Sequence, residues 1–268
     1  RMLTFGDEPV DDTFYTSRLK AAFRLRQALG LLRPDNNAYR LVHGEGDFLP
    51  GLVVDVYGTT AVLQAHSPGM HFSRDVIARA LTGIDGAGIE NVYYKSETTL
   101  PYKARLDPQN DYIIGSYSTD VAEENGLKFH VDWLKGQKTG FFVDQRDNRM
   151  LLQQYAAGRS VLNMFCYTGG FSVYAMRGDA LKVHSVDSSA KAITLTRANV
   201  ELNFPGDQRH EAFAEDAFKY LSAAKKDIYD LIILDPPAFA KHRSALRNAL
   251  IGYRRLNARA FELIAPGG

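Results

Sequence analysis

The sequence predicts an α/β fold in which a parallel, doubly wound sheet follows a small α+β domain. Three observations support this prediction. Short aliphatic runs alternate with helical patterns from Phe141 onward, as expected of a parallel sheet covered by helices. Earlier in the chain, short apolar runs are broken by Gly and Pro, which is typical of antiparallel strands. Acids or glycines directly follow the later aliphatic runs, at the strand ends where such sheets bind ligands.

The composition excludes several classes of protein. Of the 268 residues, 45% are hydrophobic and 24% are charged, as in ordinary globular proteins. No apolar run reaches the roughly 20 residues that a membrane span needs, and the N-terminal stretch has no signal-peptide pattern. A single cysteine excludes an internal disulfide and favours a reducing, cytoplasmic setting. The net charge of +1 does not by itself indicate a nucleic-acid partner.

The first domain is expected to cover residues 1–125 and to be a small α+β domain. Residues 12–32 carry apolar side chains at the spacing of an amphipathic helix. Residues 38–66 give three short apolar runs separated by turn residues, which predicts an antiparallel meander. A second helix is predicted over residues 71–84, and further β structure follows it.

The second domain is expected to cover residues 126–268 and to alternate strands with helices. The predicted strands are residues 160–165, 182–187, 210–216 and 229–234. The predicted helices are residues 143–156, 169–178, 189–203, 217–225 and 244–264. The chain ends in Pro266-Gly267-Gly268 directly after a helix, so we expect a further strand beyond residue 268.

The residues at the predicted strand ends favour a nucleoside cofactor. Thr168, Gly169 and Gly170 form a strand-to-helix turn where bare backbone can approach a ligand, although glycine also marks tight turns for structural reasons alone. Asp187 lies 18 positions beyond Gly169, near the spacing at which an acid grips a ribose. Asp187 and the two serines after it are alternatively N-caps of the next helix.

The third and fourth strand ends add two more acids. Asp216 is placed to face an adenine amino group, with Phe218 against the ring, or else to cap a helix. Asp235 precedes Pro236 and Pro237, which restrict the backbone and lack amide donors. The turn after the first strand lacks the G-x-G-x-x-G spacing of dinucleotide sites. S-adenosylmethionine is therefore favoured over NAD, with the Asp-Pro-Pro loop facing a flipped base.

Five segments resemble a known family. Residues 136–149 (GQKTGFFVDQRDNR), 161–175, 186–203 and 234–241 (LDPPAFAK) are similar to class I methyltransferases of the large-subunit rRNA cytosine-C5 type, and residues 39–58 are similar to the central domain of that family. The resemblance covers nearly the whole chain. It implies a Rossmann-like class I methyltransferase sheet, S-adenosylmethionine as cofactor, and 23S rRNA or a large-subunit assembly intermediate as partner; a homodimer stays open.

The resemblance also implies roles for individual residues. Asp235 would bond the cytosine amino group, and Phe239 would help to form the base pocket. Arg146 would lie near the methionine carboxylate of the cofactor; otherwise it is a surface helix arginine. The predicted cofactor-binding residues are Arg146, Asn163, Phe165, Tyr167, Thr168, Gly169, Gly170, Asp187, Ser188, Asp216, Ala217, Asp235 and Pro236.

The same resemblance places a nucleophilic cysteine outside this chain. Family members begin with a PUA module and carry the catalytic cysteine in a segment after the Gly-Gly, so we expect both beyond residues 1–268. Carbon 5 of cytosine becomes nucleophilic only after a thiolate adds at carbon 6. Cys166, the single cysteine here, is expected to be a small buried residue.

A cluster of cations follows the Asp-Pro-Pro motif. Lys241, Arg243, Arg247 and Arg254 lie in a stretch without acids and are predicted to hold RNA phosphates; the alternative is a merely solvated helix face. The histidines show no spacing typical of metal ligands, so no metal is expected.

Two rival functions remain from the sequence. The first is methylation of a base nitrogen, such as a guanine ring nitrogen, whose lone pair attacks directly and needs no cysteine. The second is an RNA-binding or assembly module that keeps the methyltransferase fold without activity.

Overall fold

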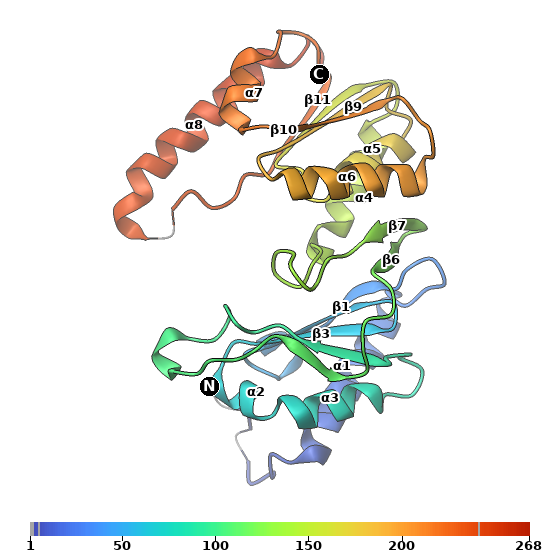
Figure 1. Ribbon diagram of the computed structural model, residues 1–268, viewed down its shortest axis with the longest axis vertical. Helices are drawn as coiled ribbons and strands as arrows, with labels where there is room; N and C mark the ends of the chain where they lie inside the picture. Colours follow the sequence, from blue (N-terminus) through green and yellow to red (C-terminus); the bar gives the residue numbers. More distant parts are fainter. Residues whose placement is uncertain (1–2, 5, 241) are drawn as a thin grey trace. The chain divides into compact units, whose positions relative to one another are not determined.

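The computed structural model describes residues 3–4, 6–240 and 242–268. The chain divides into two compact units, Arg1–Asp144 and Gln145–Gly268, and each is described by itself (Figure 1). The predicted α/β class with a parallel sheet is confirmed in the second unit.

The first unit is built on a five-stranded sheet in the order β1-β2-β3-β4-β5. Neighbouring strands pair antiparallel, except that β3 and β4 pair in parallel. The strands are β1 (Ala38–His43), β2 (Leu52–Tyr57), β3 (Thr60–Ala65), β4 (Asn91–Tyr94) and β5 (Asp111–Ile114), and the helices are α1 (Asp12–Ala28), α2 (Pro68–Phe72) and α3 (Arg74–Thr82). The meander over residues 38–66 is therefore present as predicted.

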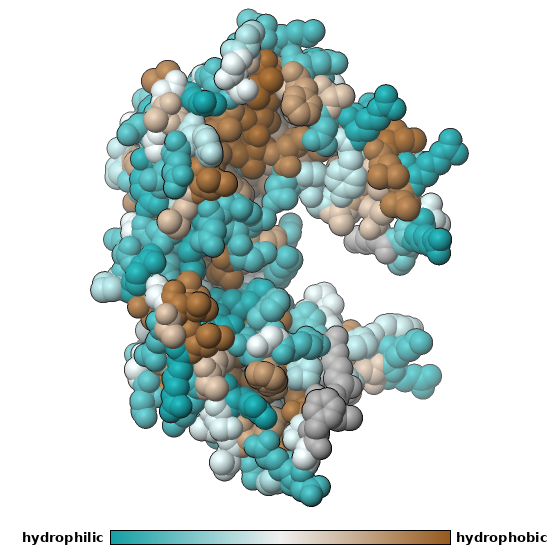
Figure 2. All heavy atoms as spheres, turned by 180° about the vertical axis from the view of Figure 1, so that it is seen from behind, coloured by the Kyte–Doolittle hydropathy of each residue, from teal (hydrophilic) through white to brown (hydrophobic). Residues whose placement is uncertain are grey.

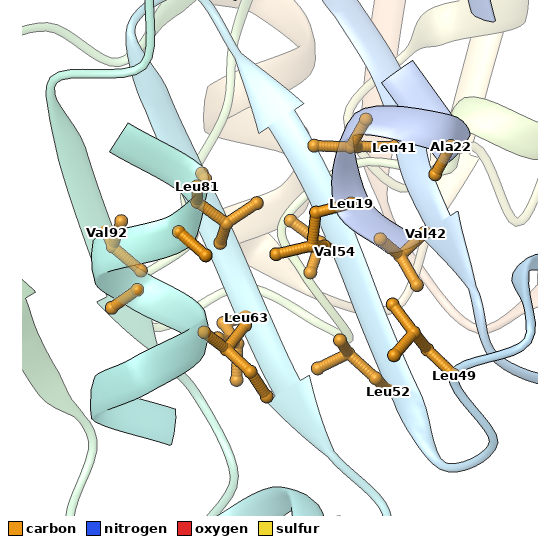
Figure 3. Packing of buried hydrophobic residues seen from close by; sticks show 14 of the residues in the cluster. Leu19, Ala22, Leu41, Val42, Leu49, Leu52, Val54, Leu63, Leu81 and Val92 are labelled. Atoms are coloured by element: carbon orange, nitrogen blue, oxygen red, sulfur yellow. The ribbon is translucent and has the colours of Figure 1, made fainter. Parts of the chain in front are cut away.

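The core of the first unit lies between this sheet and the helices α1 and α3 (Figure 3). Apolar residues of the predicted amphipathic helix, such as Leu19 and Ala22, face the strands, where Leu41, Val54 and Leu63 are buried. Burying one such leucine contributes about 1.5–3 kcal/mol, so the helix is stabilised mainly by this packing.

Part of the further β structure expected after residue 84 is a β-hairpin, which belongs to the first unit. Its strands are β6 (Val121–Glu124) and β7 (Leu127–His130). The amide of Asn37 donates to the Glu123 carbonyl at 2.9 Å, and the Glu123 amide donates to Asn37 Oδ1 at 2.7 Å. The units consequently divide after Asp144, later than the expected boundary at residue 125, because these bonds attach the hairpin to the first sheet.

A buried polar cluster attaches the segment before Gln145 to the same sheet. The carboxylate of Asp55, which has 0% exposure, accepts bonds from Arg40 at 2.7 and 2.9 Å and from Thr139 Oγ1 at 2.6 Å. The Tyr57 hydroxyl lies 2.9 Å from Thr139 Oγ1 and donates to the Phe141 carbonyl at 3.2 Å. Burial raises the pKa of Tyr57 well above its usual value, so its hydroxyl keeps its proton.

The second unit is built on a parallel sheet in the order β10-β9-β8-β11. The strands are β8 (Ser160–Met164), β9 (Lys182–Asp187), β10 (His210–Ala214) and β11 (Leu231–Leu234). The helices are α4 (Arg146–Tyr155), α5 (Gly170–Arg177), α6 (Ala190–Asn203), α7 (Ala217–Ala223) and α8 (Leu246–Leu263). The predicted helix over residues 244–264 thus begins at Leu246, after a short 3₁₀ turn.

Helices cover both faces of this sheet (Figure 1). Along β8, Leu162 and Met164 pack with Leu221 of α7 and Leu256 of α8 on one face. Asn163, between them in sequence, points to the other face, where its amide reaches α5. This alternation is the period-2 pattern of a strand buried on both sides. Among the described residues, no helix is long and apolar enough to span a membrane.

The Asp55 cluster can be tested by mutation. We expect Asp55→Ala to lower the free energy of unfolding by about 2–4 kcal/mol, because it leaves Arg40 and Thr139 without their buried acceptor. Asp35→Ala is the matched control, because the ion pair of Asp35 with Arg33 is also short, at 2.9 Å. The Arg33 side chain is 44% exposed and that of Asp35 is 52% exposed, so we expect the free energy of unfolding to fall by less than about 1 kcal/mol. Equal losses in urea denaturation would contradict a special role for Asp55.

Candidate functional site

The parallel pairing of the second sheet brings four strand ends to one edge. Phe165, Asp187, Glu215 and Asp235 follow or end β8, β9, β10 and β11. The chain order reverses at β8, which lies between β9 and β11. Ligands of open α/β sheets bind outside the carboxyl ends of the strands at such a reversal, so this edge is the candidate site.

The loop after β8 has an unusual backbone. Phe165, Tyr167 and Gly169 have φ values of 57°, 49° and 78°. These values lie in the left-handed region, which residues other than glycine rarely adopt. The Tyr167 amide donates to Asp187 Oδ2 at 3.0 Å, and the Cys166 amide donates to the Val186 carbonyl at 3.1 Å. The loop is therefore fastened to the end of β9.

Both glycines of this loop are explained by packing within the protein. A Cβ on Gly169 would lie 2.6 Å from Thr196 Cγ2, and a Cβ on Gly170 would lie 3.1 Å from Arg149 Cδ. The sequence had suggested that these glycines let a ligand approach the backbone. The space that a Cβ would need is taken by α6 at Gly169 and by α4 at Gly170, which is a structural reason for glycine at both positions. The approach of a ligand to this backbone stays a prediction.

Two polar residues of α6 hold the loop and were not identified from the sequence. Thr196 Oγ1 donates to the Tyr167 carbonyl at 2.9 Å, and Asn199 Nδ2 donates to the Thr168 carbonyl at 2.8 Å. Both side chains have 0% exposure. The signal that could have found them is the i, i+3 spacing of two polar residues on the buried side of the predicted helix.

The carboxylate of Asp187 bonds to two backbone amides. Oδ2 accepts from Tyr167, and Oδ1 accepts from the Ser189 amide at 2.9 Å. Ser189 is the cap of α6, since its side chain accepts from the Ala192 amide, while Ser188 is exposed. Each carboxylate oxygen has two lone-pair sites, so the half-buried Asp187 retains acceptor capacity for a ligand hydroxyl.

Asp216 is the N-cap of α7, as the alternative reading proposed. Its Oδ1 accepts from the Lys219 amide at 3.0 Å, its side chain is exposed, and the adjacent Ala217 is buried. Phe218 is half-buried, with the Arg255 guanidinium 5.5 Å from its ring centre. Capping uses one carboxylate oxygen, so it does not exclude a second bond from Asp216 to a ligand.

Asp235 is exposed at the end of β11 and has a side-chain neighbour that the sequence did not reveal. Gln145 Nε2 lies 3.5 Å from Asp235 Oδ2, and Asn148 Nδ2 donates to Gln145 Oε1 at 2.6 Å. The second bond fixes which end of the Gln145 amide faces the acid. Pro236, which follows Asp235, is half-buried.

Phe239 is packed within the second unit. Its ring lies 4.5 Å from the Tyr253 ring of α8 at an interplanar angle of 27°, and 6.4 Å from the Phe218 ring. It also packs against the apolar core next to α7 and α8. The Phe239 ring is thus in contact with Tyr253, Phe218 and the apolar core. These contacts give it a structural role in holding the loop, beside the predicted role in the base pocket.

Two predicted cofactor residues are buried. Arg146, at the start of α4, is 9% exposed and is not a surface arginine. Asn163 is 1% exposed, and its Nδ2 donates to Ser172 Oγ at 2.9 Å. Ser172 Oγ lies 2.6 Å from Ser185 Oγ, which lies 2.8 Å from His210 Nε2. Burial is the main cause that lowers the pKa of His210 to about 4, so this buried chain of polar groups stays neutral near pH 7.

Cys166 is a buried thiol, as expected. It is 6% exposed, and its Sγ lies 3.8 Å from Thr196 Oγ1. Burial raises the pKa of Cys166 to about 12, which keeps it protonated near neutral pH. Because the thiolate is the nucleophilic form, Cys166 is unsuited to attack a base.

The predicted cations fall into different environments. Arg243 lies in the 3₁₀ turn before α8, and Arg247 and Arg254 are exposed on α8; Lys241 lies outside the described residues. Figure 2 shows hydrophilic and hydrophobic side chains side by side where α8 projects at the upper right. Arg259, by contrast, bonds to the Leu221 carbonyl and to Glu262. Within the described residues, no group of acids, histidines and cysteine forms a metal site.

Comparison with known proteins supports this fold. A family model described as S-adenosylmethionine-dependent methyltransferase matches residues 40–268. The chain is 42% identical to ribosomal RNA large subunit methyltransferase I of Aeromonas hydrophila and 40% identical to that of Aeromonas salmonicida, covering 100% of this chain and 68% of each relative. The methyltransferase SMU.776, crystallised in complex with SAH, has a TM-score of 0.84 at 26% identity, over 99% of this chain and 68% of that one.

The packing reason for Gly169 gives a testable prediction. We expect Gly169→Ala to lower the free energy of unfolding of the second unit by about 2–4 kcal/mol, through the clash with Thr196 Cγ2 and the left-handed backbone. Thr196→Ser removes the clashing methyl and keeps the hydroxyl. The double variant should therefore recover part of the loss in denaturant titrations. Strictly additive effects of the two substitutions would refute the contact.

Proposed function

The chain belongs to the family of S-adenosylmethionine-dependent methyltransferases, and we propose that it methylates carbon 5 of a cytosine in 23S ribosomal RNA. S-adenosylmethionine is its cofactor. The observation that carries the proposal is the meeting of the β8 loop, Asp187 and Asp235 at one sheet edge, in a chain 42% identical along its whole length to a large-subunit rRNA methyltransferase.

The residues at this edge fit the chemical groups of the cofactor. We assign Asp187 to the ribose hydroxyls, because its carboxylate is half-buried at a strand end and keeps acceptor capacity. Asp216 and Phe218 are assigned to the adenine, and Arg146 with the loop after β8 to the methionine end. When bound, the cofactor supplies an electrophilic methyl group; the protein residues bind and orient the two reactants.

Asp235 is assigned to the substrate base. Its exposed carboxylate can accept a hydrogen bond from the cytosine amino group, as expected for a base turned out of its stack. The two prolines after it remove backbone donors and restrict the loop. Phe239 is assigned to the wall behind Asp235, since its ring already packs on Tyr253.

Methylation at carbon 5 also needs a thiolate that adds to carbon 6. The carbon 5 atom then attacks the methyl group, its proton is removed, and the thiolate leaves. Cys166 does not suit this step, because burial holds its pKa at about 12. The expectation that the full-length protein carries a nucleophilic cysteine beyond residue 268, like the expected PUA module, stays a prediction.

Methylation of a ring nitrogen is a second candidate. Burial raises the pKa of Cys166 to about 12, and a nitrogen lone pair can attack the methyl group directly, so this reaction would not depend on Cys166. In that reaction Asp235 would only orient the base. The two candidates give different methylated nucleosides, so analysis of the product separates them.

The exposed arginines of α8 are assigned to the RNA backbone. Arg247 and Arg254 are seven positions apart, which places them on one side of the helix, and Arg243 precedes them. Arg255 and Arg259 are engaged with Phe218 and α7 instead. Free rRNA and an assembling large subunit are both substrates to test, and a homodimer stays a prediction.

The role of Asp187 predicts a binding defect. We expect Asp187→Ala to weaken S-adenosylmethionine binding by about tenfold to a hundredfold, through the loss of bonds to a charged group and of the support for Tyr167. Isothermal calorimetry on the full-length protein measures this directly. Glu201→Gln changes an exposed acid of α6, the helix that follows Asp187 in the chain; it is the control and should bind normally. Unchanged affinity of the Asp187 variant would contradict its assignment.

Product analysis tests the reaction itself. The full-length protein is incubated with 23S rRNA and with assembling subunits, using S-adenosylmethionine that carries a deuterated methyl group. Mass spectrometry of the nucleosides should then show labelled 5-methylcytidine. Labelled methylguanosine would favour the ring-nitrogen reaction. Absence of labelled nucleosides together with absence of cofactor binding would favour an inactive RNA-binding module.

A further inference from the structure

Tyr253 of α8 contacts the Asp-Pro-Pro loop in two ways. Its ring stacks on the Phe239 ring, with 4.5 Å between the centres and 27° between the planes. Its hydroxyl oxygen accepts a hydrogen bond from the Phe239 amide at 3.2 Å. One side chain of the long helix therefore holds both the ring and the backbone of Phe239.

Gly252, next to Tyr253, leaves room for the Phe239 ring. A Cβ at this position would lie 3.1 Å from Phe239 Cδ2, closer than ordinary van der Waals contact, and 3.4 Å from Phe239 Cε2. Glycine is unfavourable inside a helix by about 1 kcal/mol relative to alanine, so stability of α8 alone does not explain it. The missing side chain lets the Phe239 ring lie against the helix backbone.

The loop between Asp235 and Phe239 belongs to no helix or strand, and its acid is exposed. Gln145 lies near the carboxylate at its start, at 3.5 Å, and Phe218 flanks Phe239 with 6.4 Å between ring centres. Pro236 and Pro237 restrict two φ angles, so a fixed Phe239 also restricts where the Asp235 carboxylate can point.

We propose that Tyr253 is a positioning residue for methyl transfer, which acts through Phe239 to hold Asp235 in place for the substrate base. This inference rests on the proposed function of Asp235 as the base-binding acid. It assigns to α8 a second task beside its exposed arginines. The helix that is assigned to RNA phosphates also fixes the loop that receives the base.

Tyr253→Phe and Tyr253→Leu separate the two contacts. The phenylalanine variant keeps the stacking and loses the acceptor for the Phe239 amide, so kcat for RNA should fall by about three- to tenfold. The leucine variant loses both contacts, and a displaced acid should lower kcat by about a hundredfold. S-adenosylmethionine affinity should stay within about twofold in both variants, since the contacts of Tyr253 described above are with Phe239 and not with Asp187, Asp216 or Arg146.

A matched control is Tyr155→Phe, which removes a hydroxyl from a tyrosine 56% exposed on α4 and should leave kcat unchanged. Gly252→Ala gives an independent check. Its methyl group should push the Phe239 ring and lower kcat, although alanine favours the helix. A purely structural role for Tyr253 predicts instead that its variants lose thermal stability and cofactor affinity together with kcat.

Amide exchange distinguishes failure of this inference from failure of the proposed function. Hydrogen–deuterium exchange of the Phe239 amide, followed by nuclear magnetic resonance on the full-length protein, should be faster in Tyr253→Phe than in the wild type. If the wild type methylates no RNA, the proposed function falls, while faster exchange would still support the loop contact. Unchanged kcat and unchanged exchange in both Tyr253 variants would overturn the inference.

Discussion

The hydrogen bond between the Tyr167 amide and the Asp187 carboxylate is the contact on which the shape of the site depends. Left-handed backbone at a residue with a side chain costs about 1–3 kcal/mol, and the loop after β8 has two such residues, Phe165 and Tyr167. The loop keeps this conformation because bonds from two directions hold it. Asp187 fixes it to the neighbouring strand, and Thr196 and Asn199 fix its carbonyls to α6. The carboxylate that is proposed to bind the ribose is thus also a support of the loop.

Much of this architecture could be predicted from the sequence, because aliphatic runs and the acids after them are local patterns. The parallel sheet and its helices follow from these patterns. The reason for Gly169 could not be predicted, since it depends on a methyl group of Thr196 that is distant in sequence. Tyr253 was missed for the same reason: its partner Phe239 is 14 positions away in a segment without regular structure. The burial of Arg146 likewise depends on packing that no periodic pattern reports.

The division between the units lies within residues 136–149 (GQKTGFFVDQRDNR), which resemble one motif in the sequence. Residues up to Asp144 belong to the first unit, where Thr139 is bound to Asp55, and Gln145 begins the second, where it faces Asp235. The turn and strand patterns before residue 126 did not predict that the first unit extends to Asp144. The reason is that the β6–β7 hairpin joins the first sheet by hydrogen bonds between Glu123 of its backbone and Asn37. The first part of the motif is therefore held by the first sheet, and the part from Gln145 onward belongs to the second unit. The sequence of the motif does not distinguish the two parts.

The position of β11 in the sheet also sets the order in which the second unit can be assembled. Strands β8 and β9 pair through residues about 22 positions apart, such as Val161 with Val183, whereas Leu231 of β11 pairs with Val161 from 70 positions away. Chain closure over a longer loop is slower, and a protein emerging from the ribosome folds its earlier segments first. Strands β8, β9 and β10 can thus pair before β11 exists, which brings together the β8 loop and Asp187, the residues proposed for the cofactor. Asp235, the residue proposed for the base, joins them only after β11 has paired with β8.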